Sequence, residues 1–129
     1  MQEPVRVTGM VLEVSPVGET DRRVVLLTKE RGKISAFARG ARKQGSRLMA
    51  ATNPFCFGEF ILYEGRNSYS LSEAVIRNYF EDMRMHFEEA CYGMYFLELM
   101  DYYTRENNDE REMLLLLYQS LRALLHAAY

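Results

Sequence analysis

The stretch from Lys33 to Leu48, KISAFARGARKQGSRL, carries five cationic side chains and no carboxylate. The longer segment 22–47 holds nine basic residues and the single acid Glu30, a local net charge of +8. From residue 51 onward, six basic residues stand against thirteen acidic ones, a net charge of −7. The formal net charge of −2 therefore conceals a patch suited to a polyanion, because the field at close range is set by local groups.

Phe37 lies in the middle of this basic stretch. If residues 33–39 form a regular strand, Ile34, Ala36 and Ala38 point to a core, and Phe37 shares the outer face with cations. An aromatic ring flanked by cations suits nucleic acid, because bases stack on the ring while the cations follow the phosphates. We expect one continuous groove made by Lys33, Phe37 and Arg39 of the strand and by Arg42, Lys43 and Arg47 of the next connection.

Other interpretations of these residues exist. A run of charge is often only a solvated face, and exposed cations on a strand discourage edge-to-edge aggregation. The segment 40–47 has the glycine spacing of a phosphate-binding P-loop, but Ser46 and Arg47 stand where that motif needs its lysine and its hydroxyl. No Ser-His-Asp set or pocket of paired carboxylates is apparent. We therefore predict a protein that is not an enzyme.

The cysteines and histidines give no metal-site pattern. Cys56 and Cys91 form no CxxC pair, and we expect two buried free thiols. His86 and His126 stand alone on helical stretches, and a zinc site needs three or four ligands. We expect both histidines at the surface or its boundary, and no metal or cofactor in this chain.

The first 77 residues have the pattern of an all-β module. Five strands are expected, at 5–14 with a bulge at Gly9, and at 23–28, 33–39, 55–64 and 69–77. The longest connection, 40–54, falls between the third and fourth strands. This order favours an OB-fold, a small barrel that binds ligands across strands two and three, with a five-stranded SH3-like barrel as the competitor. Tyr63 and Tyr69 are possible further stacking residues, although a core position is favoured for each.

Helical periodicity begins after Asn78. Residues 92–103 are apolar on nearly every side, which is typical of an enclosed helix. Asp109 and Glu112 match a capping box that opens a second helix. The apolar stripe of that helix is Met113, Leu114, Leu117, Tyr118, Leu121, Leu124, Leu125 and Ala128, with Leu115 and Leu116 in addition.

The predicted fold class is α+β: a five-stranded OB-fold barrel over residues 1–77, followed by a partial α-helical domain over 78–129. Two such apolar helices cannot bury all their faces against each other. One explanation is that the barrel together with a partner chain, which could be a second copy, covers the remaining apolar faces. The other, which we favour, is that the sequence is a piece of a longer natural protein. No apolar run approaches the ~20 residues that span a bilayer. The N-terminus has no signal-peptide features, so we expect a cytoplasmic protein.

The segment GETDRRVVLLTKERGKISAFARGARKQGSRL, followed by Asn53–Phe55, resembles the N-terminal region of the RecO family of bacterial DNA repair and recombination mediators. ACYGMYFLELMDYYTRENN and LLLLYQSLRALL are similar to the start of that family's helical domain. The likeness is most specific at Gly18-Glu19, at Leu27-Thr28 and at Arg39-Gly40-Ala41-Arg42.

The resemblance implies a protein of the nucleoid that binds single- and double-stranded DNA, anneals complementary strands and helps load the recombinase. The implied protein partners are RecR and the acidic tail of single-strand-binding protein. Family members are much longer, and many carry a cysteine-based zinc site in the part missing here. This chain is therefore expected to keep DNA affinity and to lose most mediator behaviour. The predicted DNA-contacting residues are Arg39, Arg42, Lys43 and Arg47, which match the family motif, then Arg22, Arg23 and Lys33, and the stacking residue Phe37.

A different class of function fits the same residues. The basic groove could receive an acidic peptide tail instead of nucleic acid, which would make the barrel a protein-interaction module. The two functions differ in their ligand and are separable by competition.

Overall fold

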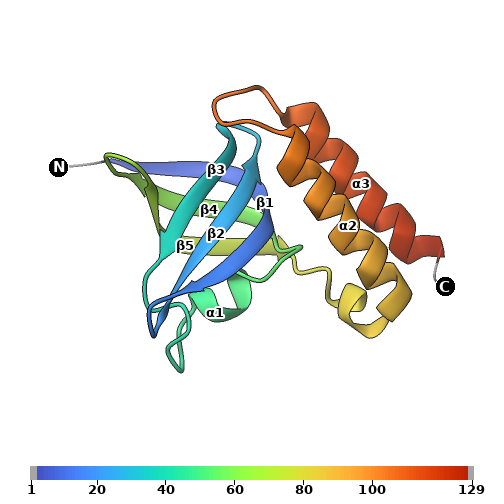
Figure 1. The fold of residues 1–129 in the computed structure, drawn as a ribbon, viewed down its shortest axis with the longest axis horizontal. Helices are drawn as coiled ribbons and strands as arrows, with labels where there is room; N and C mark the ends of the chain where they lie inside the picture. The colour runs from blue at the N-terminus through green and yellow to red at the C-terminus, as the bar shows by residue number, and fades with distance from the viewer. Residues whose placement is uncertain (1–2, 128–129) are drawn as a thin grey trace.

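The computed structural model describes residues 3–127, a small barrel followed by two long helices (Figure 1). The strands are β1 (Pro4–Val17), β2 (Asp21–Thr28), β3 (Gly32–Ala38), β4 (Phe57–Glu64) and β5 (Tyr69–Asn78). A short helix, α1 (Leu48–Ala51), lies between β3 and β4. The 3-10 turn η1 (Glu81–Met85), α2 (Phe87–Tyr103) and α3 (Arg111–Ala127) follow β5.

The strands close into a barrel in the order β1-β2-β3-β5-β4, with β4 pairing back onto β1. The neighbours are antiparallel except β3 and β5, which run parallel and pair only at Ala36 with Tyr69 and at Phe37 with Ser70. A five-stranded Greek-key barrel with a helix between β3 and β4 has the topology of an OB-fold. The predicted fold class is confirmed, and this strand order favours the OB-fold over the SH3-like alternative.

The prediction of a bulge at Gly9 is wrong. The register of β1 against β2 shifts between Val11 and Glu13 instead. A Cβ on Gly9 would lie 2.4 Å from the carbonyl oxygen of Leu27, so this glycine is required by the close approach of two strands.

Two apolar cores meet at β1 and β2. Val24 and Leu26 point into the barrel, where they pack with Ile34 and Phe60. The alternating residues of the same strands pack outward against the helices in a second core, formed by Met10, Leu12, Val25, Leu27, Phe55, Phe80, Met83, Leu97, Leu114, Leu117 and Leu121. The continuous apolar run of β2 is therefore covered on both faces, as its sequence indicates.

The helices bury one face and expose the other. In α2, Gly93 and Leu97 are buried while Phe87 is 83% and Tyr102 is 71% exposed, so the prediction that this helix is enclosed is wrong. In α3, the stripe of Leu114, Leu117 and Leu121 is buried as predicted. Leu115 and Leu116 are exposed, and Ala128 lies outside the described residues.

Helix α3, the second of the two predicted helices, begins at Arg111, close to the cap predicted at Asp109. The amide of Arg111 donates to Asp109 Oδ1 at 3.3 Å. Within residues 3–127, no helix has the length and apolarity needed to cross a membrane.

Candidate nucleic-acid interface

Strand β3 alternates as predicted and places its polar and aromatic side chains outward. Ile34, Ala36 and Ala38 are buried in the barrel core. Phe37 is half-buried on the outer face, and so are Ser35 and Lys33, which lie two and four residues before it on the same face. This outer face forms the floor of a cleft.

The cleft has a volume of about 620 Å³ and brings together three parts of the chain. Its floor comes from β2 and β3, and its walls come from the β4–β5 turn and from the loop between α2 and α3. The lining residues are Arg23, Lys33, Ile34, Ser35, Phe37, Glu64, Gly65, Arg66, Asn67, Ser68, Tyr69, Arg105 and Glu106.

Arg23 lies directly across from Phe37 in the β2–β3 register. Its Nη2 donates to Ser35 Oγ at 2.8 Å, which holds the exposed guanidinium over the outer face of β3. The structure thus places the predicted residues Arg23 and Phe37 opposite each other on neighbouring strands.

Lys33 does not offer a free charge to this cleft. Its Nζ lies 3.1 Å from Asp101 Oδ1 of α2 and also donates to the main-chain carbonyl of Asp101. The ammonium of Lys33 therefore joins the barrel to the helices. Lys33 could contact a phosphate, as predicted, only after its ion pair with Asp101 breaks.

Arg22 is turned inward. Its Nη1 donates to Met49 O at 2.9 Å, to Thr52 Oγ1 at 2.8 Å and to Asn53 Oδ1 at 3.4 Å. The half-buried guanidinium fastens α1 and the residues after it to β2. This role explains a basic residue at position 22 without a nucleic acid.

Arg42 is likewise engaged within the protein. Its Nε donates to Asp21 O at 3.0 Å, and its Nη2 donates to Val17 O at 3.4 Å and to Gly18 O. These carbonyls belong to the β1–β2 turn, so Arg42 closes that turn against the connection after β3. Two cations of the predicted continuous groove, Lys33 and Arg42, are therefore engaged in contacts within the protein.

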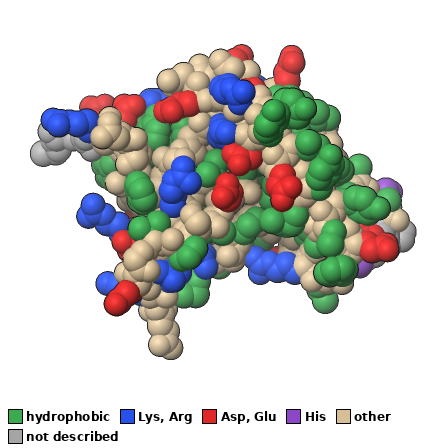
Figure 2. All heavy atoms as spheres, in the orientation of Figure 1, with side chains coloured by type: hydrophobic (Ala, Val, Ile, Leu, Met, Phe, Trp, Pro, Cys, Tyr) green, Lys and Arg blue, Asp and Glu red, His purple; other side chains and the backbone are tan. Residues whose placement is uncertain are grey.

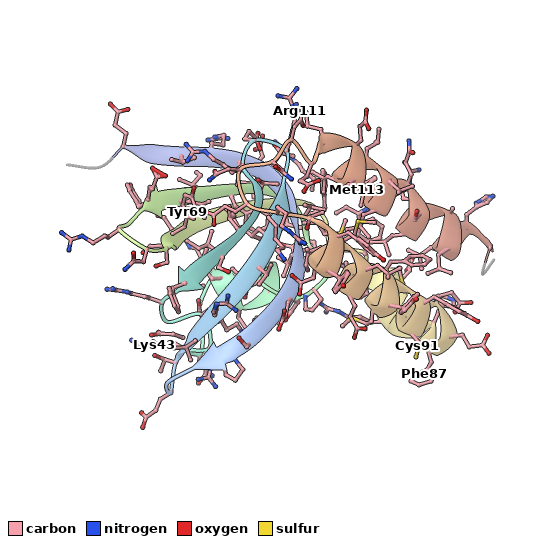
Figure 3. All side chains as sticks on the ribbon, turned by 45° about the horizontal axis from the view of Figure 1, so that its top comes forward. Lys43, Tyr69, Phe87, Cys91, Arg111 and Met113 are labelled. Atoms are coloured by element: carbon pink, nitrogen blue, oxygen red, sulfur yellow. The ribbon has the colours of Figure 1, made fainter. Side chains whose placement is uncertain are left out.

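Arg39, Lys43 and Arg47 are exposed, and none of the three forms an ion pair within the described residues. Lys43 lies at the end of the barrel away from α2 and α3 (Figure 3). The pKa of Asp21 is lowered, chiefly by the hydrogen bond from the Gly40 amide and further by the nearby charges of Arg39 and Lys43. The connection that follows β3 thus carries exposed cations without a salt bridge, two of which lie near the Asp21 carboxylate.

The two tyrosines considered for stacking differ. Tyr69 is buried, and its hydroxyl accepts a hydrogen bond from Arg31 Nη1 at 3.1 Å. This hydrogen bond and the nearby Glu64 carboxylate raise the pKa of Arg31. Tyr69 therefore belongs to the barrel core, as favoured. Tyr63 is 38% exposed on β4, so the core position favoured for it is wrong, and it is not part of the cleft.

Sequence reasoning missed the walls of the cleft. Arg66, Asn67 and Ser68 fall between the predicted strands 55–64 and 69–77, and in an OB-fold the turn between strands four and five lies beside strands two and three. Arg105 and Glu106 carry no such signal. They reach the cleft because Glu106 forms a bridge with Gly32, a contact fixed by how the helices dock.

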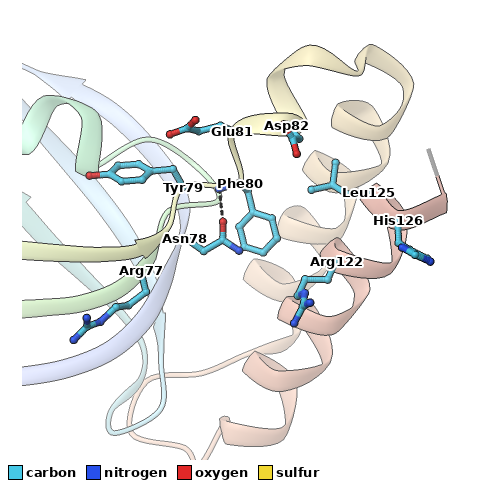
Figure 4. Close-up of a pocket in the computed structure, with 9 residues that line it drawn as sticks. All are labelled: Arg77, Asn78, Tyr79, Phe80, Glu81, Asp82, Arg122, Leu125 and His126. Atoms are coloured by element: carbon cyan, nitrogen blue, oxygen red, sulfur yellow. Dashed lines mark hydrogen bonds between the residues drawn. The ribbon is translucent and has the colours of Figure 1, made fainter. Parts of the chain in front are cut away.

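A second cleft, of about 540 Å³, lies where β5 leaves the barrel toward α3 (Figure 4). Arg77 and Arg122 line it together with Glu81 and Asp82, so its charges are mixed. Arg77 Nη2 also pairs with Glu59 Oε2 at 3.2 Å. This cleft lacks the excess of positive charge found at the end of β3.

The thiols and histidines show no ligand cluster. Cys56 is buried, and burial raises the pKa of its thiol, whereas Cys91 is exposed, which corrects the prediction that both are buried. His86 Nδ1 is 2.9 Å from Asp82 O, and His126 is exposed. Among the described residues, no three His, Cys, Asp or Glu side chains are grouped to hold a metal ion.

Comparison with known proteins adds an independent finding. A family model described as "Recombination protein O N terminal" matches residues 1–80. Proteins called DNA repair protein RecO are similar along most of the chain: that of Clostridium novyi is 35% identical over 81% of this chain and 41% of its own length. The relative from Alkaliphilus metalliredigens is 33% identical over 93% of this chain and 49% of its own length. The relative from Bacillus pumilus is 37% identical over 90% of this chain and 45% of its own length. The chain spans less than half the length of these relatives.

Proposed function

The chain belongs to the RecO family, and from that membership we propose that its barrel binds DNA in bacterial repair and recombination. The single observation that supports DNA binding best is the set of exposed, unpaired cations Arg39, Lys43 and Arg47 after β3. When exposed cations bind the phosphates of DNA, counterions are released from the phosphate chain, and this release drives binding that is largely independent of sequence.

The mechanism we propose involves no covalent step. Arg39, Lys43 and Arg47 neutralise phosphates, Arg23 adds a charge beside β3, and Phe37 offers a ring for stacking. Neutralising two approaching strands lowers their mutual repulsion, so the same surface would assist annealing. Loading of a recombinase with RecR and single-strand-binding protein, in the cytoplasm at the nucleoid, is the cellular role that we infer from the family.

The test is a charge reversal at the three free cations. We expect the triple variant Arg39→Glu, Lys43→Glu, Arg47→Glu to lose binding of a labelled oligonucleotide in fluorescence anisotropy. In wild type, affinity should fall steeply between about 50 and 200 mM salt, and three phosphate contacts should account for about two units of the slope of log K against log salt on a single strand. Arg22 and Arg42 are left unchanged because their guanidinium groups hold loops in place.

The matched control reverses the same number of charges on the helical side, at Arg84, Arg111 and Arg122. Both variants have the same net charge, so only the position of the charge differs. Equal loss of affinity in the two would contradict a site at the end of β3. Displacement of the oligonucleotide by a short acidic peptide at equal concentration would favour the protein-interaction alternative.

A further inference from the structure

A groove separate from both clefts lies where β1 meets α2. Its volume is about 300 Å³, and it shares no lining residue with the cleft over β3 or with the second cleft at the end of β5. Leu12 and Leu97, which are almost fully buried, form its floor, and Met94, which is 41% exposed, adds an apolar wall. The groove therefore offers an apolar surface to an aliphatic chain.

The charged residues that line this groove are all carboxylates. They are Glu13 of β1 and Glu98 and Asp101 of α2, and among the described residues no lysine or arginine lines the groove with them. On the face drawn in Figure 2, acidic side chains lie together over the junction of the barrel and the helices. Because like charges repel, this groove does not belong to a surface that binds phosphates.

One of these carboxylates already binds a cation of the same chain. Lys33 Nζ lies 3.1 Å from Asp101 Oδ1 and also donates to the main-chain carbonyl of Asp101. Glu13 and Glu98 are exposed, and neither forms an ion pair within residues 3–127. Two of the three carboxylates are thus available to a cation from outside the chain, beside an apolar floor.

We propose that this groove is a docking site for an arginine of a partner protein, whose aliphatic stem lies on the apolar floor while its guanidinium binds Glu13 and Glu98. An arginine side chain buries its stem along apolar surface, and its planar fork of donors matches carboxylates. Arginine is also enriched in protein interfaces, whereas lysine is depleted. The volume is at the low end of the range of about 300–1,000 Å³ for small-ligand pockets, which suits one long side chain. This contact is additional to DNA binding, since it lies on a surface that repels phosphates.

The experiment is an NMR titration of ¹⁵N-labelled wild-type protein with a tripeptide of leucine, arginine and leucine, acetylated at one end and amidated at the other. We expect chemical-shift changes centred on the amides of residues 12–14 and 94–101. The same tripeptide with citrulline in place of arginine has nearly the same shape and no charge. It should bind about 2- to 30-fold more weakly, the change that corresponds to losing two exposed ion pairs.

Protein variants separate the groove from a general effect of charge. Glu13→Gln with Glu98→Gln removes the two available carboxylates and should weaken binding of the arginine peptide by about the same factor. The matched control is Glu19→Gln with Glu88→Gln, which removes one exposed carboxylate from the barrel and one from α2, both outside the groove. The control should bind the peptide as wild type does.

Two outcomes with the wild-type protein alone would overturn the proposal: equal affinity for the arginine and citrulline peptides, or shift changes that lie away from β1 and α2. An equal loss of affinity in the control variant would overturn it as well. Shift changes at residues 12–14 and 94–101 on dilution of the protein without peptide would assign the groove to a second copy of the chain, which also contradicts a foreign partner.

Discussion

The guanidinium of Arg42 donates to the main-chain carbonyls of Asp21, Val17 and Gly18, so its contribution lies in holding the β1–β2 turn. Lys43, the next residue, is exposed and forms no ion pair within the described residues. Two adjacent cations of the same basic run therefore have different physical roles. Arg42 stabilises the fold, and Lys43 remains available to bind a phosphate.

We predict that Arg42→Ala lowers the free energy of unfolding by about 1.5–3 kcal/mol, because hydrogen bonds from a charged donor are lost and their carbonyl acceptors stay partly enclosed. Lys43→Ala, an exposed change, should alter it by no more than about 0.5 kcal/mol. Urea denaturation followed by circular dichroism measures both. An Arg42→Ala protein of unchanged stability that no longer binds DNA would instead identify Arg42 as a direct contact.

The alternation of β3 was predictable from sequence because a strand has a period of two, and Ile34 and Phe37 lie on the faces it indicates. Which cations are free was not predictable. Arg22 bonds to Met49, 27 residues away, and Lys33 bonds to Asp101, 68 residues away. Such partners are decided by the packing of loops and helices on the barrel, which the local pattern does not contain.

At the scale of elements, the β2–β3 turn and the α2–α3 loop form one unit. Gly32 has a φ of +67° and lies so close to the loop that a Cβ would be 2.4 Å from Arg105 O and 2.8 Å from Asn108 O. Gly18, in the β1–β2 turn, has a similar φ of +56° but nothing within 4 Å of its Cβ position. The two glycines share a left-handed backbone conformation and differ in the space that a side chain would have.

We predict that Gly32→Ala destabilises the protein clearly more than Gly18→Ala. Both substitutions add the strain of a left-handed non-glycine residue, about 1–3 kcal/mol, and only the first also forces the loop away from the turn. Thermal unfolding of the two variants gives the comparison. Equal losses would show that the α2–α3 loop is not held against the barrel in solution, and the cleft over β3 would then lose one wall.

The existence and type of most elements followed from local patterns, whereas the orientation of α2 did not. Turn residues and apolar runs marked five strands, and the topology then closed them into the expected barrel. Helix α2 is apolar around most of its circumference, so its sequence does not distinguish a buried face from an exposed one. The burial of Gly93 and Leu97, and the closeness of Gly93 to Phe55 and Met83, show which side meets the barrel.

The whole molecule has two surfaces of different character. On the face drawn in Figure 2, basic side chains lie over the barrel with acidic ones among them, while hydrophobic side chains gather over the helices. Helix α2 carries Glu88, Glu89, Glu98 and Asp101 and no lysine or arginine. Two kinds of self-association are therefore physically available: contact between apolar helical faces, or contact between the basic barrel of one copy and the acidic helix of another.

The exposed aromatics favour the first kind. Phe87, Tyr92, Tyr95, Tyr102 and Tyr103 are each more than half exposed along α2, more than scattered surface residues of a monomer usually show. We predict concentration-dependent association in sedimentation velocity that high salt leaves intact or strengthens, because salt screens the repulsion between the carboxylates of facing α2 helices. The double variant Tyr95→Lys, Tyr102→Lys should be monomeric, and Tyr63→Lys on the barrel should still associate. If association disappears at high salt, the contact is instead between the charged surfaces. DNA and the acidic helix α2 of a second copy would then compete for the basic residues after β3.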